Sequence, residues 1–272
     1  MEPKVFIYTS AVLYGVSTLH YLLYLIFRKD KLAVVGLYSA RFGFLTNLTG
    51  TVLLLLKGGA ETLFTPKGAF LIFALTLVSV FLYFSTRHRL SLSGAFLMPW
   101  ATLFSVLASV SSGVPKVELP VGVVGVIHII SAFLGYSAFM FSALLSVIYL
   151  IFERHLKKKK FSVFFFKLPS LTKLESVIYH SITVGFVFIT FSMFVGAIWS
   201  EELFGTYWSW HPKQVATLIS WFTYAGIIHL YLYGNWKGKR ICYLSILGFS
   251  IILLNFLGVN LLSKKDVHSF KG

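Results

Sequence analysis

Residues 121–152 read VGVVGVIHIISAFLGYSAFMFSALLSVIYLIF, and this stretch decides the fold class. It contains no Asp, Glu, Lys or Arg, and its only histidine is His128. A helix needs about 20 mostly apolar residues to cross the hydrocarbon core of a bilayer, so this stretch is long enough to span a membrane. The sequence therefore predicts a transmembrane helix here.

Seven further stretches have the same character. The eight predicted spans are 5–27, 32–56, 69–85, 92–112, 121–152, 176–198, 213–233 and 240–262. The first differs from a cleaved signal peptide because it is long and ends in basic residues instead of a small-residue cleavage site. The spans occupy most of the 272 residues and predict a single membrane domain over 1–272. The predicted fold is an all-α polytopic membrane protein with eight transmembrane helices.

The composition supports a chain whose solvent is mostly lipid. Hydrophobic residues make up 57% and charged residues 12%, whereas soluble domains have about 45–50% and about 25%. The mean hydropathy is +0.81. These values exclude a disordered chain, a soluble enzyme and a collagen-like protein. The single cysteine, Cys242, permits neither an internal disulfide nor a cysteine-cluster metal site, and we expect it to be structural.

Basic residues fall on alternate loops and indicate the orientation. Lys and Arg total 24 against nine Asp and Glu, a net charge of +15. The more basic set of loops carries Arg28, Lys29, Lys31, Arg87, Arg89, Arg154, Lys157, Lys158, Lys159, Lys160, Lys167, Lys173, Lys237, Lys239 and Arg240. The positive-inside rule makes these loops cytoplasmic and places both termini outside. The charge therefore records topology in a plasma (inner) membrane and does not indicate a nucleic-acid partner.

None of the nine acidic residues lies deep in a predicted span. A proton- or sodium-coupled transporter would normally need a buried carboxylate. A small-molecule transporter with an aromatic gate is therefore disfavoured.

The stretch WSEELFGTYWSWHPKQ at 199–214 is a tryptophan-rich loop between the sixth and seventh spans, on the predicted outer side. Its aromatic residues are Trp199, Phe204, Tyr207, Trp208 and Trp210. One interpretation is an interfacial aromatic belt, in which amphipathic rings lie at headgroup level. The other is a functional platform for a large, flat, apolar ligand with polar edges. Pro212 suits the first turn of the next helix.

Three histidines lie on this same predicted outer face: His128, His211 and His268. Neutral imidazole is a common axial ligand of haem iron. Two imidazoles from different helices, with aromatic rings between them, would hold a haem by ligation and stacking. The alternative for each histidine is an ordinary hydrogen-bonded residue. Arg41, the only formal charge well inside a span, and Lys213 are candidate partners for haem propionates; Arg41 alternatively snorkels inward.

The remaining histidines are predicted nearer the cytoplasmic side. His229, His20 and His180 lie at similar depths near the inner ends of their spans, so His229 with one partner could hold a second haem. The alternative for all three is hydrogen bonding between helices. His88 and His155 lie in basic loops, where we expect ordinary surface residues.

These residues resemble a known family. The block GTYWSWHPKQ, followed by Trp221 and His229, resembles the tryptophan-rich WWD motif of the CcsA/CcmC haem-handling superfamily. The stretch HIISAFLGY from His128, and the ending with Asn255 and His268, look like the flanks of CcsA, the membrane subunit of System II cytochrome c synthase. The resemblance covers 120–272 closely and the eight-span layout generally.

The resemblance implies that His128 and His268 are axial ligands of an exported b-type haem, which the tryptophan-rich loop cradles. It implies that His229 belongs to an inner haem site whose second ligand comes from a CcsB (ResB-type) subunit. Such a synthase presents haem to the Cys-x-x-Cys-His of apocytochrome c. No side chain of this chain is predicted to act as a catalytic nucleophile.

The sequence departs from the family at two positions. The family usually has Asp where this chain has His211, and Glu where it has Gln214. HemX-type relatives, linked to tetrapyrrole regulation, share the length and the eight spans. The predicted function is a haem-binding and haem-delivering subunit of a cytochrome c maturation complex, a haem lyase acting with its partner. The alternative is a HemX-like membrane regulator of tetrapyrrole synthesis.

Overall fold

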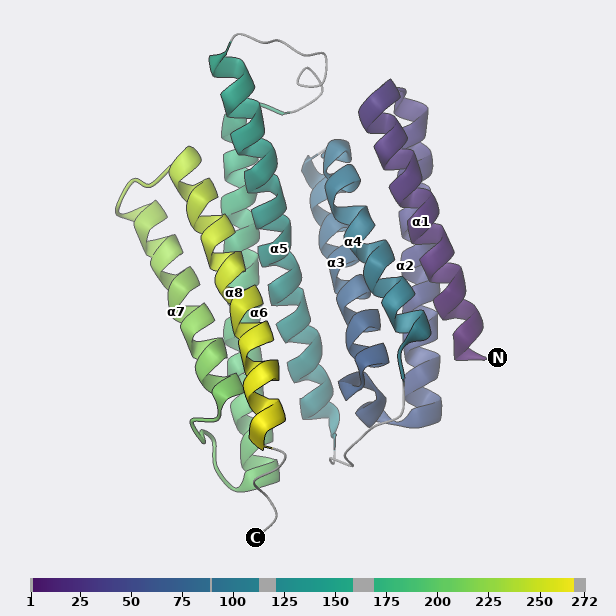
Figure 1. Cartoon of the computed structure of the whole chain (residues 1–272), viewed down its shortest axis with the longest axis vertical. Helices are drawn as coiled ribbons and strands as arrows, with labels where there is room; N and C mark the ends of the chain where they lie inside the picture. Colours follow the sequence, from purple (N-terminus) through teal and green to yellow (C-terminus); the bar gives the residue numbers. More distant parts are fainter. Residues whose placement is uncertain (1, 89, 113–120, 159–168, 267–272) are drawn as a thin grey trace.

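A computed structural model describes residues 2–88, 90–112, 121–158 and 169–266, with side chains described as far as Asn255. Within these ranges the chain forms eight α-helices, two short 3₁₀ helices and no strand (Figure 1). The α-helices are α1 (Pro3–Phe27), α2 (Asp30–Gly58), α3 (Pro66–His88), α4 (Gly94–Val110), α5 (Val123–Lys157), α6 (Leu171–Phe204), α7 (Pro212–Leu232) and α8 (Lys239–Asp266). The 3₁₀ helices are η1 (Ala60–Phe64) and η2 (Ser91–Ser93). Each predicted span corresponds to one α-helix, which confirms the all-α, eight-helix prediction.

Most of the described helices could span a membrane. Among the described residues, seven segments are long and apolar enough to cross a membrane: α1, α2, α3, η2 with α4, α5, α6 and α7. The two longest, α5 and α6, have 35 and 34 residues. At about 1.5 Å per residue they exceed a hydrocarbon core of about 30 Å, so their ends project beyond it.

Successive helices run in opposite directions (Figure 1). The end of α5 and the start of α6 lie at the upper end of the molecule (Figure 1). The start of α1, the end of α8 and the α6–α7 connection lie at the lower end (Figure 1). The alternate loops rich in Lys and Arg therefore share one end, as the charge pattern predicts. The side of the membrane that this end faces stays a prediction.

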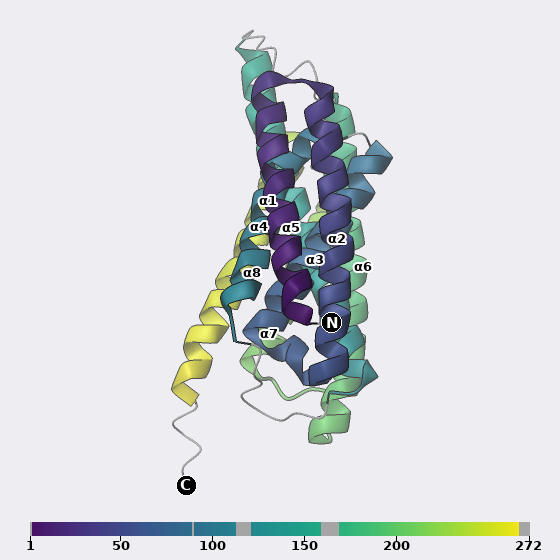
Figure 2. The ribbon, with the colours of Figure 1, turned by 90° about the vertical axis from the view of Figure 1, so that its right-hand side faces the viewer.

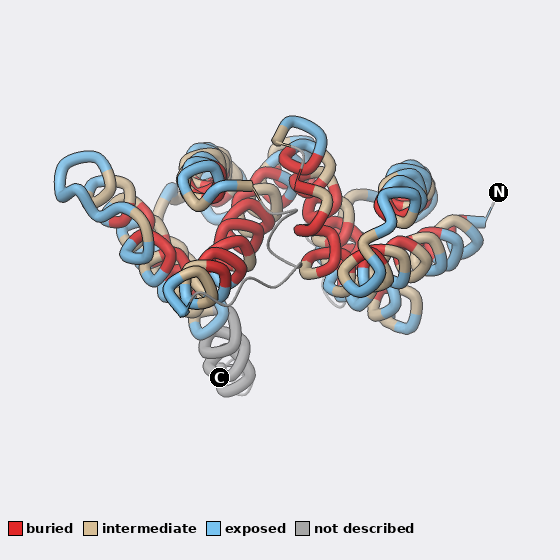
Figure 3. Tube along the Cα trace, turned by 90° about the horizontal axis from the view of Figure 1, so that it is seen from above, coloured by how far each residue is buried: buried red, intermediate tan, exposed pale blue. Residues whose placement is uncertain are grey.

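The helices form two halves, α1–α4 and α5–α8. In the first half α1 packs on α2 and α4, and α3 packs on α4; in the second, α5 packs on α6 and α8. The halves meet mainly where α3 packs on α5. Seen from above, buried residues concentrate toward the middle of the molecule and the outer helices are mostly exposed (Figure 3). In the side view α8 is tilted relative to its neighbours (Figure 2).

Small residues allow neighbouring helices to approach closely. Gly36 and Gly43 of α2, seven residues apart, face the rings of Tyr21 and Tyr14 of α1. A Cβ atom at Gly43 would lie 2.7 Å from the Tyr14 ring, so only glycine fits there. Close backbone approach at small residues is a main source of helix association in membranes.

Hydroxyl pairs between helices supply the polar part of the interior. Their Oγ atoms are 2.9–3.0 Å apart and join α1 to α4, α3 to α5, and α5 to α8. The pairs are Ser10–Ser105, Thr76–Ser137 and Ser142–Ser245. Such hydrogen bonds stabilise helix pairs in an apolar surrounding. Cys242 is buried in α8, as its predicted structural role requires.

The helix α6 is longer than its predicted span of 176–198. Ser170 caps its start, where the side chain accepts a hydrogen bond from the Lys173 N–H, and Gly205 ends it with φ +66°. Residues 199–204 are therefore helical, and the connection to α7 is 205–211 instead of the predicted loop over 199–214. The predicted start of the loop was wrong because the apolar residues end before Gly205, which is the residue that ends the helix.

Candidate functional site

His128 lies in the second turn of α5 and is fixed by α6. Its Nδ1 is 2.9 Å from the carbonyl oxygen of Ser192 and 3.1 Å from the Ser192 hydroxyl. That hydroxyl donates in turn to the His128 carbonyl at 3.1 Å. A backbone carbonyl accepts only from a protonated nitrogen, so the ring carries its proton on Nδ1. This arrangement leaves the Nε2 lone pair for a metal, as is typical of metal-binding histidines.

Gly196 makes room for this imidazole. A Cβ atom at position 196 would lie 2.6 Å from the Nδ1 of His128. Ser192 and Gly196 are four residues apart, on one face of α6. Sequence analysis missed both residues, although small residues at this spacing ahead of a tryptophan-rich stretch indicate a close helix contact.

Trp199 lies between His128 and Phe64. Its ring centre is 6.0 Å from the His128 ring and 5.2 Å from the Phe64 ring. Phe64 belongs to η1, so the first half of the molecule also reaches the site. The Trp199 Nε1–H is buried and has no hydrogen-bond partner among the described residues. Within the described chain it is therefore a donor available to a ligand.

The 205–211 connection is a folded turn with aromatic side chains on both sides. Thr206 organises it: its carbonyl accepts from the Ser200 hydroxyl at 2.8 Å, and its own hydroxyl donates to the Trp208 carbonyl at 2.8 Å. The rings of Trp208 and Trp210 meet edge to face, with centres 5.5 Å apart. The Trp208 Nε1–H is buried and unpartnered within the described chain, whereas Tyr207 and Trp210 are 62% and 72% exposed.

The two positions that depart from the family keep a hydrogen-bond acceptor. Gln214 Oε1 accepts from the Ser209 N–H at 2.9 Å and from the Ser209 hydroxyl at 3.1 Å. His211 caps α7, because its Nδ1 accepts from the Lys213 N–H at 3.4 Å. Neither interaction requires a carboxylate at these positions.

Trp221 and Asn255, which form part of the family resemblance, hold α7 in place and do not face the tryptophan-rich connection. The Trp221 Nε1–H donates to the Thr190 hydroxyl of α6 at 2.9 Å. The Asn255 side chain of α8 donates to the Ala216 carbonyl and the Ser220 hydroxyl, both at 3.1 Å. These bonds fix the helix that follows the tryptophan-rich connection.

Other predicted site residues lie elsewhere. His229 is near the opposite end of α7 from His211, roughly 27 Å away along the helix, and it is exposed and contacts the ring of Tyr233, the residue that follows α7. Arg41 lies over the Tyr38 ring on an exposed face of α2, in the other half of the molecule. His268 lies outside the described residues. The described part of the chain contains no group of three or more His, Cys, Asp or Glu that could hold a metal ion.

The structure does not bring together the three histidines that were predicted near the cytoplasmic side. His20 hydrogen-bonds the Val16 carbonyl of its own helix at 2.8 Å. The ring contacts of His180 are with α3, including His88, and not with His229. At the lower end, His128, Trp199 and Trp208 offer an imidazole nitrogen, aromatic faces and two N–H donors that have no partner in the part of the chain that the structure describes. This combination fits a large flat ligand that carries a metal and polar acceptors.

Comparisons with known proteins identify the family. The family model for the cytochrome c assembly protein matches residues 6–265. The cytochrome c biogenesis protein CcsA of Guillardia theta is 34% identical over 158 residues, which cover 53% of this chain and 52% of that protein. The CcsA protein of Heterosigma akashiwo is 30% identical over 238 residues, covering 74% and 73%.

A solved structure shares the fold. The cytochrome c haem lyase CcmF superposes with a TM-score of 0.65 at 15% sequence identity. The match covers 96% of this chain and 50% of that chain, so the present chain corresponds to half of the larger protein. The chain therefore belongs to the cytochrome c assembly protein family, as a polytopic membrane protein with the fold seen in CcmF.

Proposed function

We propose that the protein is the haem-binding and haem-delivering subunit of a cytochrome c maturation complex, presenting b-type haem at its outer face to apocytochrome c. The observation that carries this proposal is the fixed ring of His128, whose Nε2 has no hydrogen-bond partner among the described residues and whose ring centre is 6.0 Å from that of Trp199. The names of the relatives, cytochrome c biogenesis protein and cytochrome c haem lyase, agree with it.

In this proposal His128 and His268 are the axial ligands of the haem iron. The buried N–H groups of Trp199 and Trp208 hydrogen-bond the haem edge, and the aromatic rings exclude water from its face. Exposed Tyr207 and Trp210 contact the acceptor protein. The bound haem supplies the vinyl groups that the acceptor's cysteine thiols attack, while this chain's residues bind and orient.

The proposed membrane placement follows the charge pattern. The end rich in Lys and Arg faces the cytoplasm, and the tryptophan-rich connection faces outward from the plasma (inner) membrane. His229 is exposed on α7, which suits an inner haem site completed by a ligand from a CcsB (ResB-type) subunit. Arg41, exposed on α2, is a second position that a membrane partner would cover.

Haem spectroscopy of the purified full-length chain tests the ligand assignment. We expect His128→Ala and His268→Ala each to abolish the spectrum of bis-histidine ligation at the outer site. His155→Ala is the matched control, because this exposed histidine lies at the opposite end of α5. A wild type that binds no haem, or unchanged spectra in both variants, would contradict the assignment.

Co-expression with apocytochrome c and a CcsB-type partner separates the two functions that the sequence suggests. Covalent haem on the acceptor, detected by haem staining after denaturation, supports delivery. Absence of covalent haem with a competent partner would favour the HemX-like regulator. The double variant His211→Asp, Gln214→Glu restores the usual acids and shows whether their charge limits attachment.

A further inference from the structure

The short helix η1 brings an aromatic side chain of the first half to the Trp199 indole of the second half. The centre of the Phe64 ring lies 5.2 Å from that of Trp199, which in turn lies 6.0 Å from that of His128. Trp199 also lies against the first turn of α5, because a Cβ atom at Gly125 would be 3.0 Å from its Cε2. The indole therefore contacts both α5 and η1.

Hydrogen bonds of two threonines fix the backbone that carries Phe64. The Thr62 hydroxyl donates to the Gly59 carbonyl at 2.8 Å, and the Thr65 hydroxyl donates to the Thr62 carbonyl at 2.6 Å. The Thr65 hydroxyl also accepts from the Gly68 N–H at 3.1 Å. A Cβ atom at Gly68 would collide with the Thr62 carbonyl, so η1 and the start of α3 approach closely there. These contacts hold η1 in one position.

Leu63, the residue before Phe64, anchors η1 in the core. It is fully buried and belongs to one hydrophobic cluster with Ile72 of α3 and Ile129 of α5. Ile129 directly follows His128, so the anchor of η1 lies beside the helix turn that carries the imidazole. Phe64 itself is 38% exposed, and its ring is therefore not required to fill the core. Leu63 fixes η1, whereas Phe64 serves a contact at the surface.

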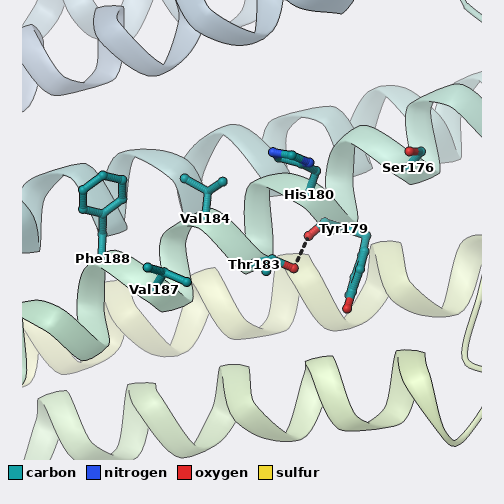
Figure 4. Close-up of a pocket in the computed structure, with 7 residues that line it drawn as sticks. All are labelled: Ser176, Tyr179, His180, Thr183, Val184, Val187 and Phe188. Atoms are coloured by element: carbon teal, nitrogen blue, oxygen red, sulfur yellow. Dashed lines mark hydrogen bonds between the residues drawn. The ribbon is translucent and has the colours of Figure 1, made fainter.

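The other end of α6 lacks a comparable second wall. A groove of about 410 Å³ lies there, along one face of α6 (Figure 4). Its lining residues lie between Ser176 and Phe188 and include His180. Among the described residues, no side chain from another helix lines this groove. At the Trp199 end, by contrast, α5, α6 and η1 all contribute rings or close contacts.

We propose that Phe64 is a positioning residue for the haem: η1 holds its ring against Trp199 and thereby sets the orientation of the indole beside the His128 imidazole. The inference rests on the proposed function, in which the ligand at His128 is a haem. Aromatic pairs prefer defined relative orientations. A site holds its ligand precisely only when the side chains that touch the ligand are themselves fixed by a supporting layer. Phe64 is part of that layer and acts through Trp199.

The first measurement needs no haem. The full chain is labelled with 5-fluorotryptophan, and the fluorine NMR signal of Trp199 is assigned by its loss in Trp199→Phe. We expect Phe64→Ala to shift and broaden this signal, because the indole loses the ring that holds it. Phe64→Tyr keeps the ring and should leave the signal sharp. Phe70→Ala is the matched control: it removes a ring pair with Phe104 within the same half and should leave the Trp199 signal unchanged.

The second measurement is a hemin titration of the same variants in detergent, followed by absorbance, with the outer site identified by its loss in His128→Ala. Losing one aromatic pair corresponds to a roughly 2- to 10-fold change in an equilibrium constant. Phe64→Ala should therefore weaken hemin binding by about this factor and shift the reduction potential of the bound haem. Phe64→Tyr should restore both values, and Phe70→Ala should change neither.

Gly68→Ala tests whether η1 acts through Phe64. The added Cβ would collide with the Thr62 carbonyl, so η1 must move. We expect the same changes in the Trp199 signal and in hemin affinity as in Phe64→Ala. The double variant should bind hemin no more weakly than Phe64→Ala, because both changes remove one contact; additive losses would contradict the proposal. Elution volume checks that each variant is folded, and Phe64→Leu replaces Phe64→Ala if the latter aggregates.

Two results overturn the proposal and leave the proposed function intact. One is an unchanged Trp199 signal in Phe64→Ala, and the other is an unchanged hemin affinity and reduction potential in a variant whose Trp199 signal has moved. In both cases the wild type still binds hemin and loses it in His128→Ala. If the wild type binds no hemin, the proposed function fails and the haem role of Phe64 fails with it. The fluorine signal, recorded without haem, separates these cases.

Discussion

The histidines that lie near the two ends of α6, His128 of α5 and His180 of α6, are held differently. At the lower end His128 is enclosed: a carbonyl fixes its Nδ1, and Gly196 leaves space only for the imidazole. At the upper end His180 is exposed in an open groove beside His88. A preorganised ligand holds its cargo in one orientation, whereas an open site admits and releases it. The difference therefore separates an enclosed histidine with a fixed ring at one end from an exposed histidine at the other.

Gly196→Ala should have the largest effect, because it would remove the enclosed position of His128. The added Cβ would lie 2.6 Å from the His128 Nδ1, so the imidazole must move. We expect a loss of about 1–3 kcal/mol in stability, as for overpacked interiors, and loss of haem from the outer site. Thermal unfolding and haem absorbance measure both effects. Gly226→Ala is the control, because a Cβ at that position meets nothing within 4 Å; equal behaviour of the two variants would show that the His128 pocket is not tight.

Ser192→Ala tests how much of the His128 orientation depends on the hydroxyl. The backbone carbonyl still accepts from Nδ1, while the hydroxyl bonds to Nδ1 and to the His128 carbonyl are lost. The expected cost is about 0.5–1.5 kcal/mol, which corresponds to a roughly two- to tenfold weaker haem affinity. Ser181→Ala on the same helix removes only a bond to Val177 and should not change affinity. A larger loss of haem affinity in Ser181→Ala than in Ser192→Ala would contradict the role of Ser192 in orienting His128.

Gln214 variants sharpen the comparison at the tryptophan-rich connection. Gln214→Leu removes the acceptor for both Ser209 donors and should loosen residues 205–211. Gln214→Glu keeps an acceptor and adds negative charge to the first turn of α7, which favours stability by about 0.3–1 kcal/mol. The melting temperature should therefore rank Glu above Gln above Leu. A melting temperature for Leu equal to that of Gln would show that the bonds to Ser209 do not hold the connection.

The Glu2–Lys57 ion pair lies at the same end but outside the site, and its removal should matter least. Both side chains are largely exposed, and such pairs contribute little. The hydrogen bond from Lys57 lowers the pKa of the Glu2 carboxyl below 4.5, so the small stabilisation exists above that pH and disappears as the pH falls through the lowered pKa. Glu2→Gln should leave the melting temperature at pH 7 nearly unchanged; a clear decrease would show that this contact organises the end of the molecule.

The sequence predicts the helices well because span length and hydropathy are local properties. It predicts helix ends less well: α6 continues to Phe204, six residues beyond the predicted span, and ends where Gly205 adopts φ +66°. His128 and Trp199 were named as candidates from the sequence because they carry recognisable chemistry, and the structure brings their rings into contact. Phe64 and the pairing of His88 with His180 were not, because both depend on how separate helices pack.

The division into two halves has a consequence for synthesis at the ribosome. Once α4 has left the ribosome, all the helices on which α1 and α3 pack within the first half have been synthesised. The helix α5 then adds to an existing surface through α3, and its partners α6 and α8 follow. Domains generally fold in the order of synthesis, so Phe64 is in place before Trp199 is translated. The first half thus acts as a template on which α5–α8 are assembled.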